Sequence, residues 1–134
     1  MKYLGIDYGI KNVGIAISDE NGTMAFPKTI LKNNSSLVSD VLALVKEDEV
    51  EEIVIGESLN YKGQPNLIMK KIIPFKKSLE DSLGKKVFFE PEFLTSLEAE
   101  KTQGRKDKLD SSAAALILKS FLDRKNNAQI KDKN

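Results

Sequence analysis

The sequence predicts an α/β fold: a mixed five-stranded sheet, made of a three-strand antiparallel meander plus two parallel strands, with helices on both faces. Three observations lead to this prediction. Short apolar runs alternate with turn residues over positions 1–26, which is typical of strands joined by tight turns. Two later apolar runs, at 53–56 and 87–89, each follow a segment with helical spacing of apolar residues. Helices that alternate with strands in this way cover both faces of one sheet.

The opening segment supplies the three strands of the meander. Residues 3–6 and 13–17 are apolar runs joined by a short polar turn. The dipeptide Asn21-Gly22 favours the positive φ angles of a primed hairpin turn. A third strand is expected over 23–26, and it should stop at Pro27 because proline has no N–H to donate to a ladder.

The middle of the chain predicts two helices around a buried strand. Apolar residues at helical spacing begin at position 37, and the run at 53–56 has almost no polar residue. That run should therefore be a central, parallel strand. A second helix is expected over 67–83, where Pro74 should kink or divide it and Gly84 should end it.

The last third predicts one more strand and two more helices. The strand at 87–89 should end at Glu90-Pro91-Glu92, and a short helix should follow at 96–102. Asp110 and Ser111 are suited to cap a final helix that runs from residue 112 to about Arg124.

Length and composition limit the classes of function. The 134 residues fit one domain, 1–124, followed by a polar tail at 125–134 that we expect to be disordered. The net charge of +1 requires that any nucleic-acid contact use a local basic patch. The absence of Cys and His excludes thiolate and imidazole metal sites and His-based acid–base catalysis. Without a signal-peptide pattern or a membrane-length apolar run, we expect a cytoplasmic protein with no membrane partner.

Four acidic residues occupy similar places in this predicted topology. Asp7 ends the first strand, Glu57 ends the fourth, Glu92 follows the fifth and Asp110 opens the last helix. Functional groups gather outside the carboxyl ends of parallel strands, so these carboxylates could meet at one spot. Carboxylates that lie so close together cannot all ionise without cations. Mg²⁺ (or Mn²⁺) held by such oxygens could support phosphodiester cleavage by two ions.

Each of these acids also has a structural interpretation. A lysine or a hydrogen-bonded turn could meet the charge of Asp7, and Asp110 could act only as a helix cap. Glu92 could be a solvated loop residue, and Glu57 could pair with a nearby lysine. Only the joint placement of the four favours a metal site.

Four sequence blocks carry a family resemblance. GIDYGIKNVGIAISD, IVIGESLNYKG, PEFLTSLEAE and LDSSAAALILKSFLD follow one another within residues 1–124. Together they resemble the YqgF-type family, described as pre-16S rRNA nucleases and as Holliday-junction-resolvase-like proteins. The resemblance implies an RNase H-like fold, with Asp7, Glu92 and Asp110 at the family's acidic positions.

The chain also departs from that family's pattern. Asn12 stands where the family usually has Arg, and Pro91 and Phe93 replace the Asp and Arg around Glu92. The missing Arg residues would ordinarily hold phosphate. Glu57 replaces a usual Leu, and by resemblance to junction resolvases it would restore a metal ligand at the end of strand four.

Several polar residues on predicted loops could contact phosphates near the acidic cluster. They are Lys11, Asn12, Lys62, Arg105, Lys106 and Lys108. Tyr8 and Tyr61 are candidate platforms for stacked bases. The alternative is that such lysines are part of a solvated face.

The leading hypothesis is a metal-dependent endonuclease acting on structured nucleic acid. By resemblance, 5′-end processing of pre-16S rRNA comes ahead of branched DNA as substrate. The alternative is a nucleic-acid-binding module of the same fold that cleaves weakly or not at all. A sugar-kinase-like or actin-like ATPase would share the GIDYGIKN hairpin, but such enzymes need two lobes. A homodimer is an open option, because a two-fold junction suits a two-fold symmetric protein.

Overall fold

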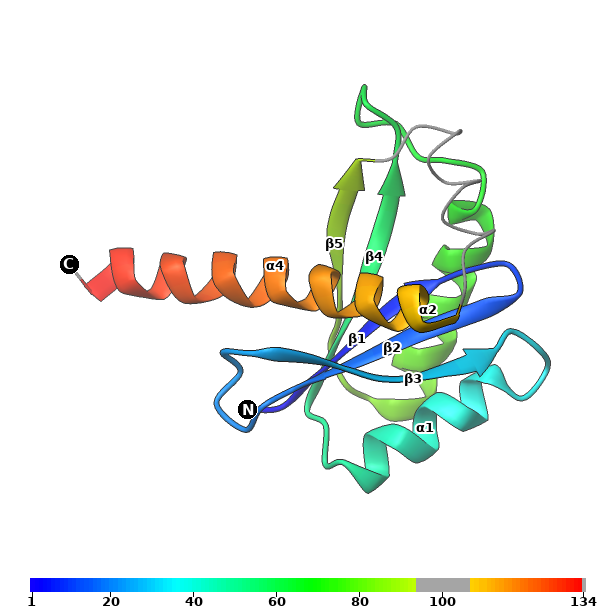
Figure 1. Cartoon of the computed structure of the whole chain (residues 1–134), viewed down its shortest axis with the longest axis horizontal. Coiled ribbons are helices and arrows are strands. Elements are labelled where there is room, and N and C mark those ends of the chain that lie inside the picture. Colours follow the sequence, from blue (N-terminus) through cyan, green and yellow to red (C-terminus); the bar gives the residue numbers. More distant parts are fainter. Residues whose placement is uncertain (94–106, 134) are drawn as a thin grey trace.

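The computed structural model describes residues 1–93 and 107–133. The predicted helix at 96–102 lies outside them. The described elements are β1 (Tyr3–Tyr8), β2 (Asn12–Ser18), β3 (Ala25–Lys32), α1 (Leu37–Glu47), β4 (Glu52–Leu59), α2 (Met69–Leu83), β5 (Val87–Phe93) and α4 (Asp107–Lys133). The strands form one sheet in the order β3-β2-β1-β4-β5 (Figure 1). The β1–β2 and β2–β3 pairs are antiparallel, and β4 is parallel to both β1 and β5, which confirms the predicted mixed sheet.

The side chains of the sheet alternate between two separate cores. On one face Leu4, Ile6, Ile53 and Ile55 pack with buried residues of α1 and α2. On the other face Tyr3, Ala16 and Val54 pack against α4, through Ala114, Leu118 and Leu122 among others. Successive residues of a strand point to opposite faces, so each strand contributes to both cores. The two faces are called here the α1/α2 face and the α4 face.

Both edge strands are longer than predicted, and both contain a proline. β3 continues through Pro27 to Lys32, and β5 continues through Pro91 to Phe93. A register shift between Ile15 and Ala16 of β2 accommodates the strand around Pro27. Proline is tolerated at a sheet edge because its missing N–H can face away from the ladder. Treating each proline as a strand end was therefore wrong.

The central strand β4 is also longer than predicted. It pairs with β5 as far as Leu59, which lies opposite Phe93. Beyond the end of β1, its other edge forms a bridge between Leu59 and Pro65. The prediction that Glu57 ends this strand was therefore wrong, because both edges of β4 find partners past residue 56.

The second helix is a single element despite its proline. α2 begins at Met69 rather than at residue 67, and it contains Pro74 without dividing. Ile72, Phe75 and Leu79 are buried against the sheet. Burial of this apolar side can offset the one backbone hydrogen bond that a proline removes. As predicted, Gly84 ends the helix, in the left-handed conformation at φ 62°.

The last helix differs from its prediction at both ends. α4 begins at Asp107, so Asp110 lies within its first turn and not at its cap. It continues past Arg124 to Lys133, crossing the sheet and extending beyond its edge (Figure 1). Lys125 contacts Tyr3 and Glu52, and Asn126 donates to the carbonyl of Gly22 at 3.2 Å. These polar contacts hold the helix where the sequence shows no apolar pattern.

In the described part of the chain, no helix has the length and apolar character needed to cross a membrane. The prediction of a cytoplasmic location stays a prediction.

Candidate functional site

Two acidic residues come together on the α4 face of the sheet. Asp7 is near the carboxyl end of β1 and Glu92 near that of β5, and strand alternation places both on this face. Burial, together with the smaller effects of the nearby charges of Asp7 and Glu90, raises the pKa of Glu92 to about 8. The two carboxyl groups are therefore close enough to oppose each other's ionisation.

A glycine lies between the two acids. β4 separates β1 from β5, and the β1–β4 register pairs Ile6 with Ile55, so Asp7 and Gly56 are the next positions along. A Cβ atom built on Gly56 would lie 2.8 Å from Oε2 of Glu92. The carboxylate of Glu92 thus lies over the backbone of β4, on the side toward Asp7.

A third acid on this face is paired. Glu90, only 7% exposed, accepts a 2.5 Å hydrogen bond from the guanidinium of Arg124 on α4. Burial raises the pKa of Glu90, and Arg124 opposes that rise. Arg124 thereby offsets part of the negative charge that Glu90 adds to the surroundings of Glu92.

Two uncharged polar residues lie near the acids on the same face. Ser58 is opposite Glu92 in the β4–β5 register and is buried. Its hydroxyl accepts a hydrogen bond from the side-chain amide of Asn66 at 3.0 Å, and its carbonyl accepts one from the Asn66 N–H at 2.9 Å. These bonds hold the loop after β4 against the end of the strand.

Glu57 does not join this group. It follows Ile53 and Ile55 on alternate positions of β4, and both isoleucines belong to the α1/α2 core. Gly56, next to it, faces α4, because a Cβ there would also meet Ile117 at 2.8 Å. The structure therefore does not bring Glu57 together with Asp7, because the strand continues regularly through residue 57.

The other predicted site residues are described to different extents. Asp110 and Lys108 lie in the first turn of α4, with side chains outside the description, and Arg105 and Lys106 lie outside the described residues. Lys11 and Lys62 are exposed, and Asn12 begins β2.

The two predicted stacking tyrosines have different environments. Tyr61 is 75% exposed, and the ammonium of Lys62 lies 5.8 Å from its ring centroid. Tyr8 packs against Phe75 of α2, with ring centroids 5.0 Å apart. Tyr61 is thus available for stacking, whereas the ring of Tyr8 is part of the α1/α2 core.

The donors of the site suit a hard divalent cation. Asp7 and Glu92 present carboxylate oxygens, which such ions prefer, and a cation would offset the burial and the repulsion that together raise the pKa of Glu92. Among the side chains that the structure describes, no group of three potential metal ligands comes together. A third carboxylate would have to come from a side chain outside the description, such as that of Asp110.

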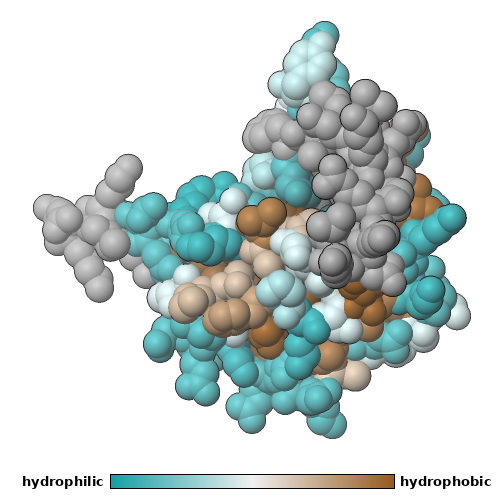
Figure 2. All heavy atoms as spheres, in the orientation of Figure 1, coloured by the Kyte–Doolittle hydropathy of each residue, from teal (hydrophilic) through white to brown (hydrophobic). Residues whose placement is uncertain are grey.

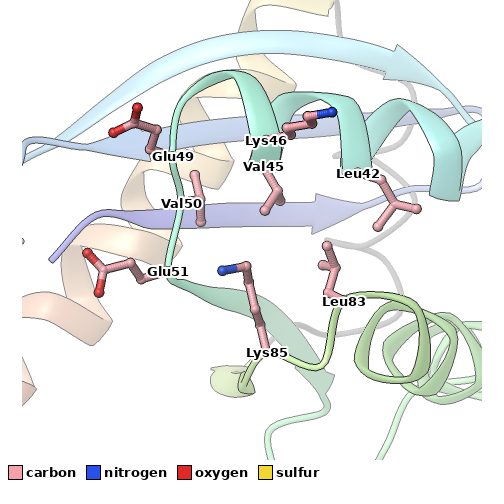
Figure 3. A pocket seen from close by; sticks show the side chains of 8 residues that line it. All are labelled: Leu42, Val45, Lys46, Glu49, Val50, Glu51, Leu83 and Lys85. Atoms are coloured by element: carbon pink, nitrogen blue, oxygen red, sulfur yellow. The ribbon is translucent and has the colours of Figure 1, made fainter.

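A separate pocket lies at the other end of the sheet. It has a volume of about 390 Å³ and is formed by residues that precede β4 and β5 and by the helices of the α1/α2 face (Figure 3). Its lining residues are Leu42, Val45, Lys46, Glu49, Val50, Glu51, Leu83 and Lys85. The acids at the carboxyl ends of β1 and β5 do not contribute to it, so it is distinct from the acidic site.

Comparison with known proteins identifies the family. The model of the RuvX family, described as a Holliday junction resolvase family, matches residues 1–124. The chain belongs to the RuvX family. A relative from Nitratidesulfovibrio vulgaris, named "Putative pre-16S rRNA nuclease", is 36% identical over 91% of this chain and 93% of its own length. A relative of the same name from Caldanaerobacter subterraneus is also 36% identical, over 96% of this chain and all of its own.

Solved structures confirm an RNase H-like fold for this RuvX-family chain. Thermus thermophilus RuvC has a TM-score of 0.60 at 15% identity, covering 95% of this chain and 97% of its own. The fowlpox virus Holliday junction resolvase has a TM-score of 0.52 at 18% identity, covering 92% and 99%. The same RuvC has been solved in complex with a Holliday junction substrate.

Three residues of the acidic site were missed by the sequence analysis. Gly56 carries a recognisable signal, since a glycine inside an apolar strand often marks a close approach by another group. Glu90 shares the alternation of Glu92, two positions away. Arg124 has no local signal, because its partner is 34 residues distant in the chain.

Proposed function

We propose that this chain is a divalent-metal-dependent endonuclease that hydrolyses phosphodiester bonds in structured nucleic acid. Precursor 16S rRNA is the leading substrate, on the names of the relatives, and Holliday junction DNA is the second. The observation that carries the proposal is the pair formed by Asp7 and Glu92, whose mutual repulsion and burial call for a cation. A nuclease of this family would use such a pair.

In this proposal Asp7 and Glu92 hold the metal, and Asp110 adds a ligand from the first turn of α4. When bound, a divalent ion such as Mg²⁺ or Mn²⁺ supplies Lewis-acid stabilisation of charge at the phosphate. Glu92 must lose its proton to serve as a ligand, so metal binding and proton release are coupled at this residue.

The basic residues would hold the substrate backbone. Lys11 follows β1 and Lys62 follows β4, so both exposed ammonium groups lie beyond the strand ends that carry the site. Arg105, Lys106 and Lys108 precede or begin α4 and would add contacts. Together with Asn12 they would contact phosphates, which predicts affinity that falls with rising salt.

The test is cleavage of a pre-16S rRNA fragment and of a four-way DNA junction with Mg²⁺ or Mn²⁺. Asp7→Asn should lower the rate by about 100-fold or more, because it removes a metal-binding carboxylate from the site. Asp81→Asn is the matched control, since Asp81 is an exposed residue of α2 paired with Lys77, and it should cleave as the wild type does. Equal rates for the wild type and Asp7→Asn would contradict the proposal.

A second candidate is a nucleic-acid-binding module of the same fold. The residues Asn12, Pro91 and Phe93 favour it, because they replace the usual charged residues of the family pattern. This candidate predicts that the wild type binds both substrates but cuts neither with either metal. Sedimentation of the protein with and without the junction would also test the option of a homodimer.

A further inference from the structure

Gly56, which has no side chain, leaves the space in which the carboxylate of Glu92 lies. Oε2 of Glu92 would be 2.8 Å from a Cβ at this position and its Cδ atom 3.5 Å, so any side chain would occupy the space that the carboxylate uses. Real Cβ atoms do not approach a neighbouring oxygen this closely. The glycine is therefore a steric requirement for the observed position of Glu92.

This position matters because Asp7 and Glu92 are on strands that do not touch. β4 runs between β1 and β5, so Glu92 approaches Asp7 only by leaning across the backbone of β4. Val54 and Ser58, the neighbours of Gly56 on this face, are both buried with side chains in place. Gly56 is the gap between them, and the carboxylate of Glu92 lies against it.

We infer that Gly56 is a positioning residue of the acidic site: it holds no ligand itself, but it seats the carboxylate of Glu92 beside Asp7. The inference deepens the proposed function, on which it rests for the purpose of the site. The effect of Gly56 on the position of the Glu92 carboxylate concerns the metal-free protein, so it can be tested separately.

A second glycine on the α4 face provides a contrast. A Cβ on Gly5 of β1 would lie 2.7 Å from Cβ of Leu118 and 3.1 Å from the carbonyl oxygen of Ala114. Both of these atoms are close to the helix backbone, so Gly5 permits α4 to approach the sheet. The atoms that crowd Gly56 are instead the ends of two flexible side chains, Glu92 and Ile117. Gly56→Ala should therefore fold and move a side chain, whereas Gly5→Ala must move the helix.

The experiment separates the two neighbours of Gly56 by thermal denaturation of the full chain without metal. Gly56→Ala should lower Tm by roughly 5 °C through overpacking. In the Gly56→Ala background, Glu92→Asp shortens the carboxylate side chain and should recover at least half of the loss in Tm. Each double variant is compared with its single variants. Ile117→Val removes the other crowded atom, Cδ1, and should recover only part. Recovery by Ile117→Val alone, with none from Glu92→Asp, would overturn the inference.

Isothermal titration calorimetry with Mn²⁺ then measures metal binding at the acidic site. Gly56→Ala should weaken Mn²⁺ binding about 10-fold, as displacement of a supporting group does. The double variant Gly56→Ala/Ile117→Val should still bind Mn²⁺ weakly, although the steric overlap with Ile117 is removed. Ile117→Val alone should bind as the wild type does. Unchanged binding in a folded Gly56→Ala protein would contradict the inference. A wild type that binds no Mn²⁺ would count against the proposed function, while the denaturation cycle would still decide the role of Gly56.

Discussion

The two faces of the sheet differ in what their side chains do. The α1/α2 face is a continuous apolar core. Every strand except the edge strand β3 contributes at least one buried aliphatic residue to it, which in β5 is Val87. The α4 face has a smaller apolar core, two glycines in close contact with other groups, and the acids Asp7, Glu90 and Glu92. In Figure 2, apolar residues gather at the centre of the face that α4 crosses, and hydrophilic residues surround them.

This difference separates stability from chemistry within one sheet. Buried aliphatic side chains provide most of the folding free energy, and a carboxylate placed among them would be costly. On the α4 face, the acids are accommodated by Arg124 and by Gly56. The pocket at the far end of the α1/α2 face contains no part of the acidic site. We therefore expect substitutions on the two faces to affect different measurements.

The largest expected effect on stability comes from the α1/α2 core. Leu79→Ala, at a fully buried position of α2, should lower the free energy of unfolding by about 2–5 kcal/mol because it leaves a cavity. Urea unfolding measures this loss. Cleavage per folded molecule should stay close to the wild-type value, since Leu79 packs in the α1/α2 core and the acids lie on the other face of the sheet. If Leu79→Ala lowered the cleavage rate as much as Asp7→Asn does, the two faces would not have separate roles in stability and chemistry.

The pH dependence of stability should come mainly from the α4 face. The folded-state pKa of Glu92, about 8, is above the ordinary glutamate value of 4.5, so the native state holds this proton more tightly than the unfolded state. Its contribution is fully present below pH 4.5 and is lost as pH rises through 8, a change on the order of a few kcal/mol. Glu92→Gln should flatten this fall in the metal-free protein.

Urea unfolding at several pH values, with and without Mn²⁺, tests this expectation. Glu20→Gln, at an exposed turn, should keep the wild-type pH profile. Mn²⁺ should restore stability at high pH in the wild type but not in Glu92→Gln. A wild-type profile that matches the Glu92→Gln profile would show that Glu92 ionises freely.

The smallest effect concerns the ion pair that α4 makes with the sheet. Arg124→Met keeps the aliphatic stem but removes the bond to Glu90, and it should cost about 1 kcal/mol at neutral pH, since Arg124 is itself 58% exposed. Thermal denaturation at pH 7 and pH 4 measures it, and the cost should shrink at pH 4 as Glu90 gains a proton. Lys119→Met breaks an exposed pair with Asp123 on the same helix and should cost about 0.5 kcal/mol or less.

The sequence predicted the parts of the fold that depend on local pattern. The mixed sheet, the helix after β3 and the stop at Gly84 follow from apolar periodicity and from glycine conformation. The strand ends at Pro27 and Pro91 were wrong, because whether a proline is tolerated depends on which strands are at the sheet edge. The start of α4 was wrong for a related reason: a good capping residue such as Asp110 also fits within a first turn.

For the candidate site, the sequence by itself determined the chemistry of the donors. A chain without His or Cys must use oxygen ligands, and Asp7 and Glu92 were identified from their places in the strands. Only the tertiary structure decided which acids meet. Strand register sends Glu57 to the opposite face and leaves a glycine between β1 and β5, and both results depend on pairing between strands far apart in the chain. Side-chain direction changes with every residue along a strand, so a site of this kind depends on register that local sequence does not carry.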